Sequence, residues 1–214
     1  MPAMATIATS VIAMDGPLPD ADELDQRVRE LRRRFPRAVI DRYLGGVPTV
    51  GPRALLAPGA AVVGDVRIGP DASIWYTAVL RADLAPIVVG AGANVQDGTV
   101  VHVADDTPCE IGEGTVVGHR AMLHACRIEA GCLIGMQATI LDEVVIGHGS
   151  VVGAGALVTQ RTVIPPRSLV LGAPAKVVRK LGEEDEAFHR AVAAKYVRLK
   201  ENYRCDALRE DVRD

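Results

Sequence analysis

Residues 128–170 read IEAGCLIGMQATILDEVVIGHGSVVGAGALVTQRTVIPPRSLV. Every sixth position of this stretch holds an aliphatic residue, and the spacing stays in step from one end to the other. The repeated residues are Ile128, Ile134, Ile140, Ile146, Val152, Val158, Ile164 and Val170. An α-helix would repeat its apolar residues about every 3.6 positions, so this period is not helical. It indicates a chain built from many copies of one short unit.

The same spacing extends toward the N-terminus in three shorter runs, which begin at Val62, Val89 and Ile111. Glycine often follows the aliphatic residue, as at Gly135 and Gly147. These six-residue units resemble the hexapeptide repeats of the left-handed parallel β-helix. The resemblance implies an all-β solenoid shaped as a triangular prism, in which three units form one coil and the aliphatic side chains fill the interior. Successive coils would stack at the strand spacing of about 4.8 Å.

The composition agrees with a narrow interior, because 49% of the 214 residues are hydrophobic but only 3% are aromatic. The net charge is −3, from 24 basic and 27 acidic residues, which argues against nucleic acid as a partner. No apolar stretch reaches the roughly 20 residues of a membrane helix, so we expect no membrane partner. The four cysteines form no CxxC pair, and we expect a cytoplasmic protein with reduced cysteines.

Both flanks of the repeat have helical patterns. Residues 20–35 repeat their apolar residues at the spacing of an amphipathic helix, and Pro36 ends the pattern. A longer C-terminal helix should begin near Glu183 and pack along the outside of the prism, while its His189 stays in solvent. The expected packing stripe of this helix is Phe188, Val192, Tyr196, Leu199 and Tyr203. The predicted parts of the chain are an N-terminal extension with its helix (1–39), the β-helix (40–175) and the C-terminal helical segment (176–214).

The repeat register locates the histidines in space. His102 and His124 each directly follow the aliphatic residue of a unit, and three units, or one coil, separate them. The two imidazoles should therefore stack on one face at a distance that lets them share a metal ion. The extra residues 107–110 between these units should leave the register as a loop. His148 falls on another face and should not be a ligand.

His119 occupies a different position in its unit, around a corner from the first two histidines. Either it is unrelated to them, or it completes a site across a subunit boundary in a three-fold assembly. The same counting puts Arg81 one coil below His102, and Asp97 one coil below His119. Arg81 of one chain should therefore meet Asp97 of its neighbour wherever the histidines of two chains meet.

Four segments carry a more specific resemblance. Residues 94–102, NVQDGTVVH, and residues 117–124, VGHRAMLH, resemble the signature of the gamma-class carbonic anhydrase family, including its His-x16-His-x4-His spacing. Residues 73–83 and 172–176 resemble two further segments of that family. The resemblance implies a homotrimer with a metal at each subunit interface. In that arrangement His102 and His124 come from one chain, and His119 comes from its neighbour.

The family resemblance also implies a lyase that reversibly hydrates CO₂ to bicarbonate. Zn²⁺ is the expected metal, with Fe²⁺ or Co²⁺ as alternatives, because imidazole ligands suit all three. The resemblance places Arg81, Asp83, Gln96 and Asp97 around the metal, where Gln96 would orient the attacking hydroxide and Arg81 would bind bicarbonate. Tyr196 would approach from the C-terminal helix. The alternative is that the three charged residues only tie the trimer together and that Tyr196 only packs its helix.

Two other functions stay open. Many hexapeptide-repeat proteins are acyltransferases, which need a catalytic histidine beside a long CoA-binding cleft, whereas here the metal pattern uses the suitable histidines. The third alternative is a metal-binding or assembly protein with little or no catalysis. Leu84 stands where fast members of the family carry a glutamate that transfers protons, which favours slow hydration of CO₂.

Overall fold

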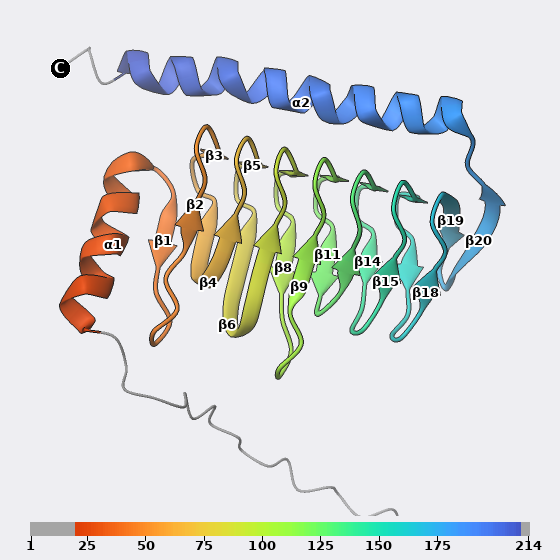
Figure 1. The fold of residues 1–214 in the computed structure, drawn as a ribbon, viewed down its shortest axis with the longest axis horizontal. Coiled ribbons are helices and arrows are strands. Elements are labelled where there is room, and N and C mark those ends of the chain that lie inside the picture. The colour runs from red at the N-terminus through yellow and green to blue at the C-terminus, as the bar shows by residue number, and fades with distance from the viewer. Residues whose placement is uncertain (1–19, 211–214) are drawn as a thin grey trace, which may run out of the picture.

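The computed structural model describes residues 20–210, with side chains described as far as residue 204. This part of the chain forms a row of stacked coils with a short helix at its N-terminal end and a long helix along its side (Figure 1). The strands of successive coils pair in parallel. The predicted left-handed parallel β-helix with two flanking helices is therefore confirmed.

Each coil contributes one strand to each of three faces. The first face contains β1 (Val39–Asp41), the first halves of β4 (Ala61–Ile68) and β6 (Val79–Val89), β8 (Val100–His102), β11 (Met122–His124), β14 (Thr139–Ile140) and β17 (Leu157–Val158). The second face contains β2 (Thr49–Val50), the second halves of β4 and β6, β9 (Cys109–Ile111), β12 (Arg127–Ile128), β15 (Val145–Ile146) and β18 (Val163–Ile164). The third face contains β3 (Leu55–Leu56), β5 (Ser73–Ile74), β7 (Asn94–Val95), β10 (Val116–Val117), β13 (Leu133–Ile134), β16 (Val151–Val152), β19 (Ser168–Gly172) and β20 (Ala175–Lys180).

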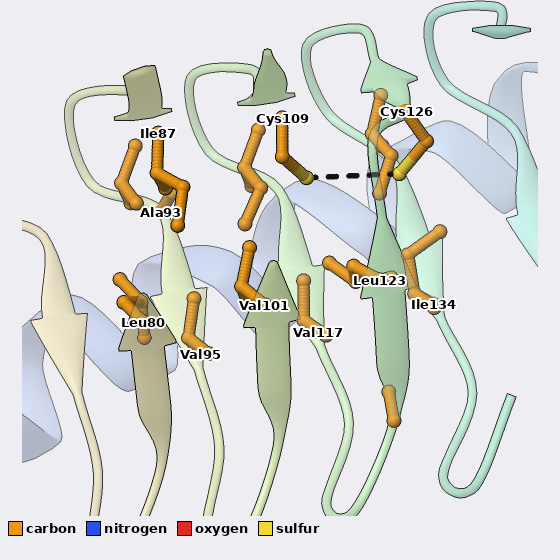
Figure 2. Close-up of a cluster of buried hydrophobic side chains, with 14 of the residues drawn as sticks. Leu80, Ile87, Ala93, Val95, Val101, Cys109, Val117, Leu123, Cys126 and Ile134 are labelled. Carbon is orange, nitrogen blue, oxygen red and sulfur yellow. Dashed lines mark hydrogen bonds between the residues drawn. The ribbon is translucent and has the colours of Figure 1, made fainter. Parts of the chain in front are cut away.

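The six-residue period sets the interior. None of the eight aliphatic residues repeated in 128–170 is more than 3% exposed. Each of them lies beside an aliphatic residue of a neighbouring coil, as in the pairs Ile128↔Ile146 and Ile134↔Val152. Figure 2 shows the resulting ladders inside the prism. The labelled residues include Leu80, Val101 and Leu123 on the first face, Ile87, Cys109 and Cys126 on the second, and Val95, Val117 and Ile134 on the third.

One turn departs from the register between β8 and β9. Ala104 and Thr107 form an antiparallel bridge, in which each backbone N–H donates to the carbonyl of the other residue, at 3.3 and 3.1 Å. Cys109–Ile111 then resume the repeat as β9. The excursion therefore lies at 104–107, and the prediction of a loop over 107–110 is wrong by a few residues. The reason is that the apolar Cys109, which is fully buried, fills an interior position.

Helix α1 (Ala21–Arg34) covers the N-terminal end of the prism. Asp20 caps it, because its carboxylate accepts a hydrogen bond from the Asp22 N–H at 3.0 Å. Two of its arginines donate to carbonyl groups of the first coil. Arg32 Nε reaches the Ile40 oxygen at 2.9 Å, and the Arg34 guanidinium reaches the oxygens of Val50 and Gly51 at 2.9 and 2.7 Å. The helix thus satisfies part of an edge that would otherwise be open. The predicted helix at 20–35 is confirmed, and residues 1–19 of the predicted extension lie outside the described residues.

Helix α2 (Glu183–Glu210) runs back along the prism toward α1 (Figure 1). Its start agrees with the acidic residues that predicted it. Residues 176–180, which the sequence assigned to the C-terminal helical segment, instead belong to β20 (Ala175–Lys180), which pairs antiparallel with β19. Residues 211–214 lie outside the described residues. Among the residues that the structure describes, neither helix combines the length and apolarity that a membrane span requires.

The packed face of α2 differs in part from the predicted stripe. Phe188 is 64% exposed, whereas His189 is only 9% exposed, so both expectations for these residues are wrong. Burial lowers the pKa of the His189 imidazole, although the charges of Asp185 and Glu186 oppose this shift. The sequence pattern placed Phe188 on the packed side of the helix, whereas the structure exposes it and buries Lys200 completely.

An ion cluster fixes α2 to the turn before β5. The Lys200 ammonium donates to Asp71 Oδ1 at 3.1 Å and also pairs with Glu201. Arg53 pairs with the same Asp71 carboxylate. The hydrogen bonds from Arg53 and Lys200 outweigh the effect of burial and lower the pKa of Asp71 to about 2. A fully buried ammonium is therefore compensated by a carboxylate that stays ionised.

We predict that Asp71 makes the stability of the fold sensitive to acid. Its pKa in the folded chain is about 2, below the ordinary value of 3.8, so its stabilising effect is complete above about pH 4. The effect is lost as the pH falls from about 4 toward 2. The Asp71→Asn variant should lose about 2 kcal/mol of unfolding free energy at pH 7, because Lys200 loses an acidic partner.

Urea unfolding at pH 7, 4 and 3 measures this effect. The difference between the variant and the unmodified chain should shrink as the pH falls. Asp105→Asn, in the exposed turn after β8, is the control and should leave the free energy of unfolding unchanged at all three values. A difference that stays constant with pH would show that Asp71 acts through packing rather than charge.

Candidate metal centre

Two histidines lie side by side on the first face. His102 ends β8 and His124 ends β11, and the two are direct partners across the parallel strands. Arg81 of β6 is the partner of His102 on the other side. The predicted column of Arg81, His102 and His124 is thus present. His102 Nδ1 lies 3.1 Å from His124 Nε2, and the centres of the two rings are 5.1 Å apart.

A carboxylate holds the outer side of each ring. Asp83 Oδ1 lies 3.0 Å from His102 Nε2, and Asp142 Oδ1 lies 2.5 Å from His124 Nδ1. Such contacts fix the orientation and the tautomer of an imidazole, and they increase its basicity toward a metal. In His124 they leave Nε2 as the nitrogen turned toward His102.

Asp142 was missed by the sequence analysis. Leu123 pairs with Ile140 of the next coil, so the same register places Leu141 beside His124. Asp142 directly follows Leu141. Counting one coil beyond His124 would have found this carboxylate, whereas the family resemblance drew attention only to the coils below.

Asp83 is also paired with Arg81. Burial disfavours its ionised form, but the hydrogen bond with His102, a backbone hydrogen bond and the charge of Arg81 outweigh that effect. The pKa of Asp83 is therefore below its usual range. A guanidinium, an ionised carboxylate and an imidazole follow one another along the first face, and the arginine side chain is half exposed at the surface.

His119 lies around the corner that follows β10. Its Nδ1 is 2.8 Å from Asp97 Oδ2, so the predicted stacking of these two residues is present. The side chains of His119 and Asp97 are 41% and 40% exposed. Within the part of the chain that the structure describes, no three or more His, Cys, Asp or Glu side chains of one chain form a group that could hold a metal. One chain therefore brings together two of the three predicted ligands, and the third faces outward.

The other predicted residues lie on the third face or its corner. Gln96 follows β7 and is almost fully buried beside Asp97. The Tyr196 ring of α2 contacts the edge of Trp75, with ring centres 6.3 Å apart. The indole nitrogen of Trp75 donates in turn to Ser73 Oγ at 3.1 Å. The structure thus gives Tyr196 a packing contact with the third face.

His148 lies apart from these residues, as predicted. It follows β15 of the second face, and its Nδ1 is 3.7 Å from Glu129 Oε2. The corner it occupies is not the corner of His119.

The donor chemistry of the His102–His124 pair fits a transition metal. One nitrogen of each imidazole lies 3.1 Å from a nitrogen of the other, and each ring has a carboxylate on its far side. Zn²⁺ sites in proteins have this pattern of histidine ligands supported by outer carboxylates. A catalytic site of this kind takes three protein ligands, so the pair needs one more.

Comparisons with known proteins agree with the fold. The pattern of the bacterial transferase hexapeptide family (six repeats) matches residues 125–160. The crystal structure of a hexapeptide transferase family protein from Anaplasma phagocytophilum is 38% identical, with a TM-score of 0.74, and the match covers 77% of this chain and 98% of that one.

Sequence relatives point to one family. A carbonic anhydrase from Geobacillus kaustophilus is 40% identical, over 76% of this chain and 89% of the relative. Gamma carbonic anhydrase 1 of Arabidopsis thaliana, a mitochondrial protein, is 45% identical over 71% of this chain. The chain spans only 58% of the length of that plant protein. The bacterial relative is matched over nearly its whole length. The chain therefore belongs to the gamma-class carbonic anhydrase family.

Proposed function

We propose that the chain is a metal-dependent carbonic anhydrase that interconverts CO₂ and bicarbonate at a site shared by neighbouring chains of a homotrimer. One observation carries this proposal. His102 and His124 form a supported pair, while the third histidine of the signature, His119, points outward from another corner. Three-fold symmetry would bring the outward histidine of each chain to the pair on the next.

His102 and His124 of one chain and His119 of its neighbour would hold the metal. Zn²⁺ is the first candidate, with Fe²⁺ or Co²⁺ as alternatives. When bound, such a metal lowers the pKa of coordinated water to about 7 and so supplies hydroxide at neutral pH. Each of these imidazoles has a carboxylate beside one ring nitrogen: Asp83 for His102, Asp142 for His124 and Asp97 for His119. In His124 and His119 the carboxylate is beside Nδ1, so Nε2 is directed away from it.

The remaining residues would act on CO₂ and bicarbonate. Arg81 lies one coil below His102 with its side chain half exposed, which supports a role in binding the bicarbonate anion. Across the interface it would also meet Asp97 of the neighbour. Gln96 would orient the attacking oxygen through its amide. The contact of Tyr196 with Trp75 favours a packing role for this tyrosine over direct catalysis.

The reaction releases one proton for each CO₂ hydrated, and this proton must reach the solvent. Leu84 follows Asp83, and it packs partly buried against the core. A slow proton transfer would limit turnover even with a competent metal site. The proposed enzyme is therefore a slow one unless a buffer accepts the proton. If the turnover of CO₂ were negligible, the chain would be a metal-binding protein that assembles without useful catalysis, which is the third alternative.

The buried cysteines support a reducing compartment such as the cytoplasm. Cys109, Cys126 and Cys132 are free thiols in the interior. Burial raises the pKa of Cys132 to about 12, so it stays protonated and unreactive.

An acyltransferase is the second candidate, because the matching repeat pattern and the Anaplasma relative both carry transferase names. Acetyl-CoA separates the two functions. Protection of the chain from thermal unfolding by acetyl-CoA would favour a transferase, and its absence would favour the carbonic anhydrase.

A mixing experiment tests the shared site. His119→Ala and His124→Ala chains, each inactive alone, are unfolded together, refolded with metal and assayed by stopped-flow CO₂ hydration. Mixed trimers should recover about a quarter of the unmodified activity, because one site in four combines the intact His102–His124 pair with an intact His119.

The control mixes His102→Ala with His124→Ala. Both changes damage the same side of the site, so no combination of these chains restores it. Recovery in the control, or none in the first mixture despite trimer formation, would contradict a site shared in this way.

A second prediction concerns Asp142. Asp142→Asn should weaken Zn²⁺ binding by about 10- to 100-fold, because His124 loses the carboxylate that orients it. Competition with a chelating dye measures the affinity directly, without reference to activity, and the unmodified protein should hold about one metal ion per chain. Glu143→Gln is the matched control, since Glu143 pairs with Arg161 at the surface. Equal affinities of the Asp142 variant and this control would show that the carboxylate does not support the metal ligand.

A further inference from the structure

A pocket lies at the corner between the second and third faces, near the C-terminal end of the row of coils. Its volume is about 560 Å³, within the usual range for small-molecule sites. It is built from the turn after β15, the turn from β18 into β19, and strand β20. The lining residues are His148, Pro165, Pro166, Arg167, Ser168, Val177 and Lys180. The histidine pair of the proposed metal site belongs to the first face, so the pocket is a separate feature.

The charge of the pocket is one-sided. Three of its lining residues are basic, and no acidic residue is among the described residues that line it. Among the described residues, the Lys180 ammonium takes part in no ion pair. An uncompensated lysine in a concave, basic site creates a positive potential that attracts anions.

The other two basic groups keep donors available. Arg167 pairs through Nε with Glu186 of α2, which leaves the two terminal amino groups of its guanidinium. The backbone N–H of His148 donates to Glu129 Oε2 at 2.9 Å, and the ring Nδ1 lies 3.7 Å from the same oxygen. The ring Nε2 of His148 is thus not engaged by this carboxylate. Arginine and lysine together are a common combination for phosphate, since one offers paired donors and the other a point charge.

The walls of the pocket are held in place before any ligand binds. The Arg167 N–H donates to the His148 oxygen at 2.8 Å, and the Leu181 N–H donates to the Arg167 oxygen at 2.6 Å. Ser168 Oγ donates to the Pro165 oxygen at 2.7 Å. A preformed site loses little conformational freedom on binding.

Part of the lining is apolar. Pro165, Pro166 and Val177 contribute hydrocarbon surface, and Val177 is about half exposed in the chain. An exposed valine beside a lysine without an acidic partner suggests a ligand with both an anionic group and an apolar portion.

We propose that this pocket binds the phosphate group of a small phosphorylated molecule, whose apolar portion lies against Pro165, Pro166 and Val177. Arg167, Lys180 and the Nε2 side of the His148 ring contact the phosphate group. The site is independent of the proposed carbonic anhydrase activity, because its residues come from other faces and other coils.

Calorimetric titration of the metal-free, assembled protein with phenyl phosphate, inorganic phosphate and phenol tests the proposal. Phenyl phosphate should bind several-fold more tightly than inorganic phosphate, and phenol should not bind measurably. The affinity for phenyl phosphate should also fall as the salt concentration increases. In a phosphate-free buffer, no binding of either phosphate up to roughly 10 mM would overturn the proposal. Equal affinities for the two phosphates would overturn the apolar contacts.

Substitutions locate the binding. Lys180→Gln should weaken binding of phenyl phosphate by about tenfold, the loss expected for one charge-assisted hydrogen bond. Lys176→Gln, on the same strand but outside the lining, should bind as the unmodified chain does. Arg167→Gln should also weaken binding, but it removes one of the ion-pair partners of Glu186, so Lys180→Gln is the decisive variant.

His124→Ala separates this proposal from the proposed function. Phosphate binding that survives His124→Ala and weakens in Lys180→Gln supports the pocket, whatever the carbonic anhydrase assay shows. Binding that is lost in His124→Ala and kept in Lys180→Gln places the phosphate at the histidines and overturns the inference.

Discussion

The interior of the prism admits a single column of aliphatic side chains on each face, and the rest of the structure depends on that restriction. Because every interior position is filled in step, as in the pairs Ile128↔Ile146 and Ile146↔Ile164, each coil is locked in phase with the next. A residue that points outward then has a fixed height and a fixed face. The pair of His102 and His124 is a direct result of this locking, since both follow interior residues that are themselves partners. The site on the surface is therefore positioned by packing in the core.

The first and last coils of the row each expose backbone groups that have no neighbouring coil to bond with. Inside the row, each coil satisfies the backbone groups of its neighbours, but the first and last coils have open edges. At the first coil, Arg32 and Arg34 of α1 donate hydrogen bonds to some of these backbone carbonyl groups. At the other end β20 folds back on β19 as an antiparallel partner. Helix α2 then returns along the side of the row, where the buried Lys200 meets Asp71. The flanking segments thus complete the coils rather than forming separate units.

The interior and the histidine column could be predicted from the sequence because a single period governs both. Counting by sixes places Arg81, His102 and His124 in one column, and the strand pairings agree. The helix α2 could not be read in this way, since its packed face depends on what lies opposite. Lys200 is buried because Asp71 is there to receive it, and no helical periodicity contains that information. The repeat register alone does not assign His119 to the metal site for the same reason, because its partners would lie in another chain.

The bridged turn at Ala104 and Thr107 shows where this fold tolerates a change in length. It follows His102 directly and adds residues at a corner, yet the next strand returns to the repeat and His124 still lies beside His102. Insertions at corners can therefore lengthen or shorten during evolution without cost to the histidine column. A deletion of one residue inside a strand would instead turn every later outward residue toward the interior until the next corner absorbed the error. Divergence among relatives of this chain should accordingly be concentrated in corner loops, and such loops are the natural places to attach new segments by design.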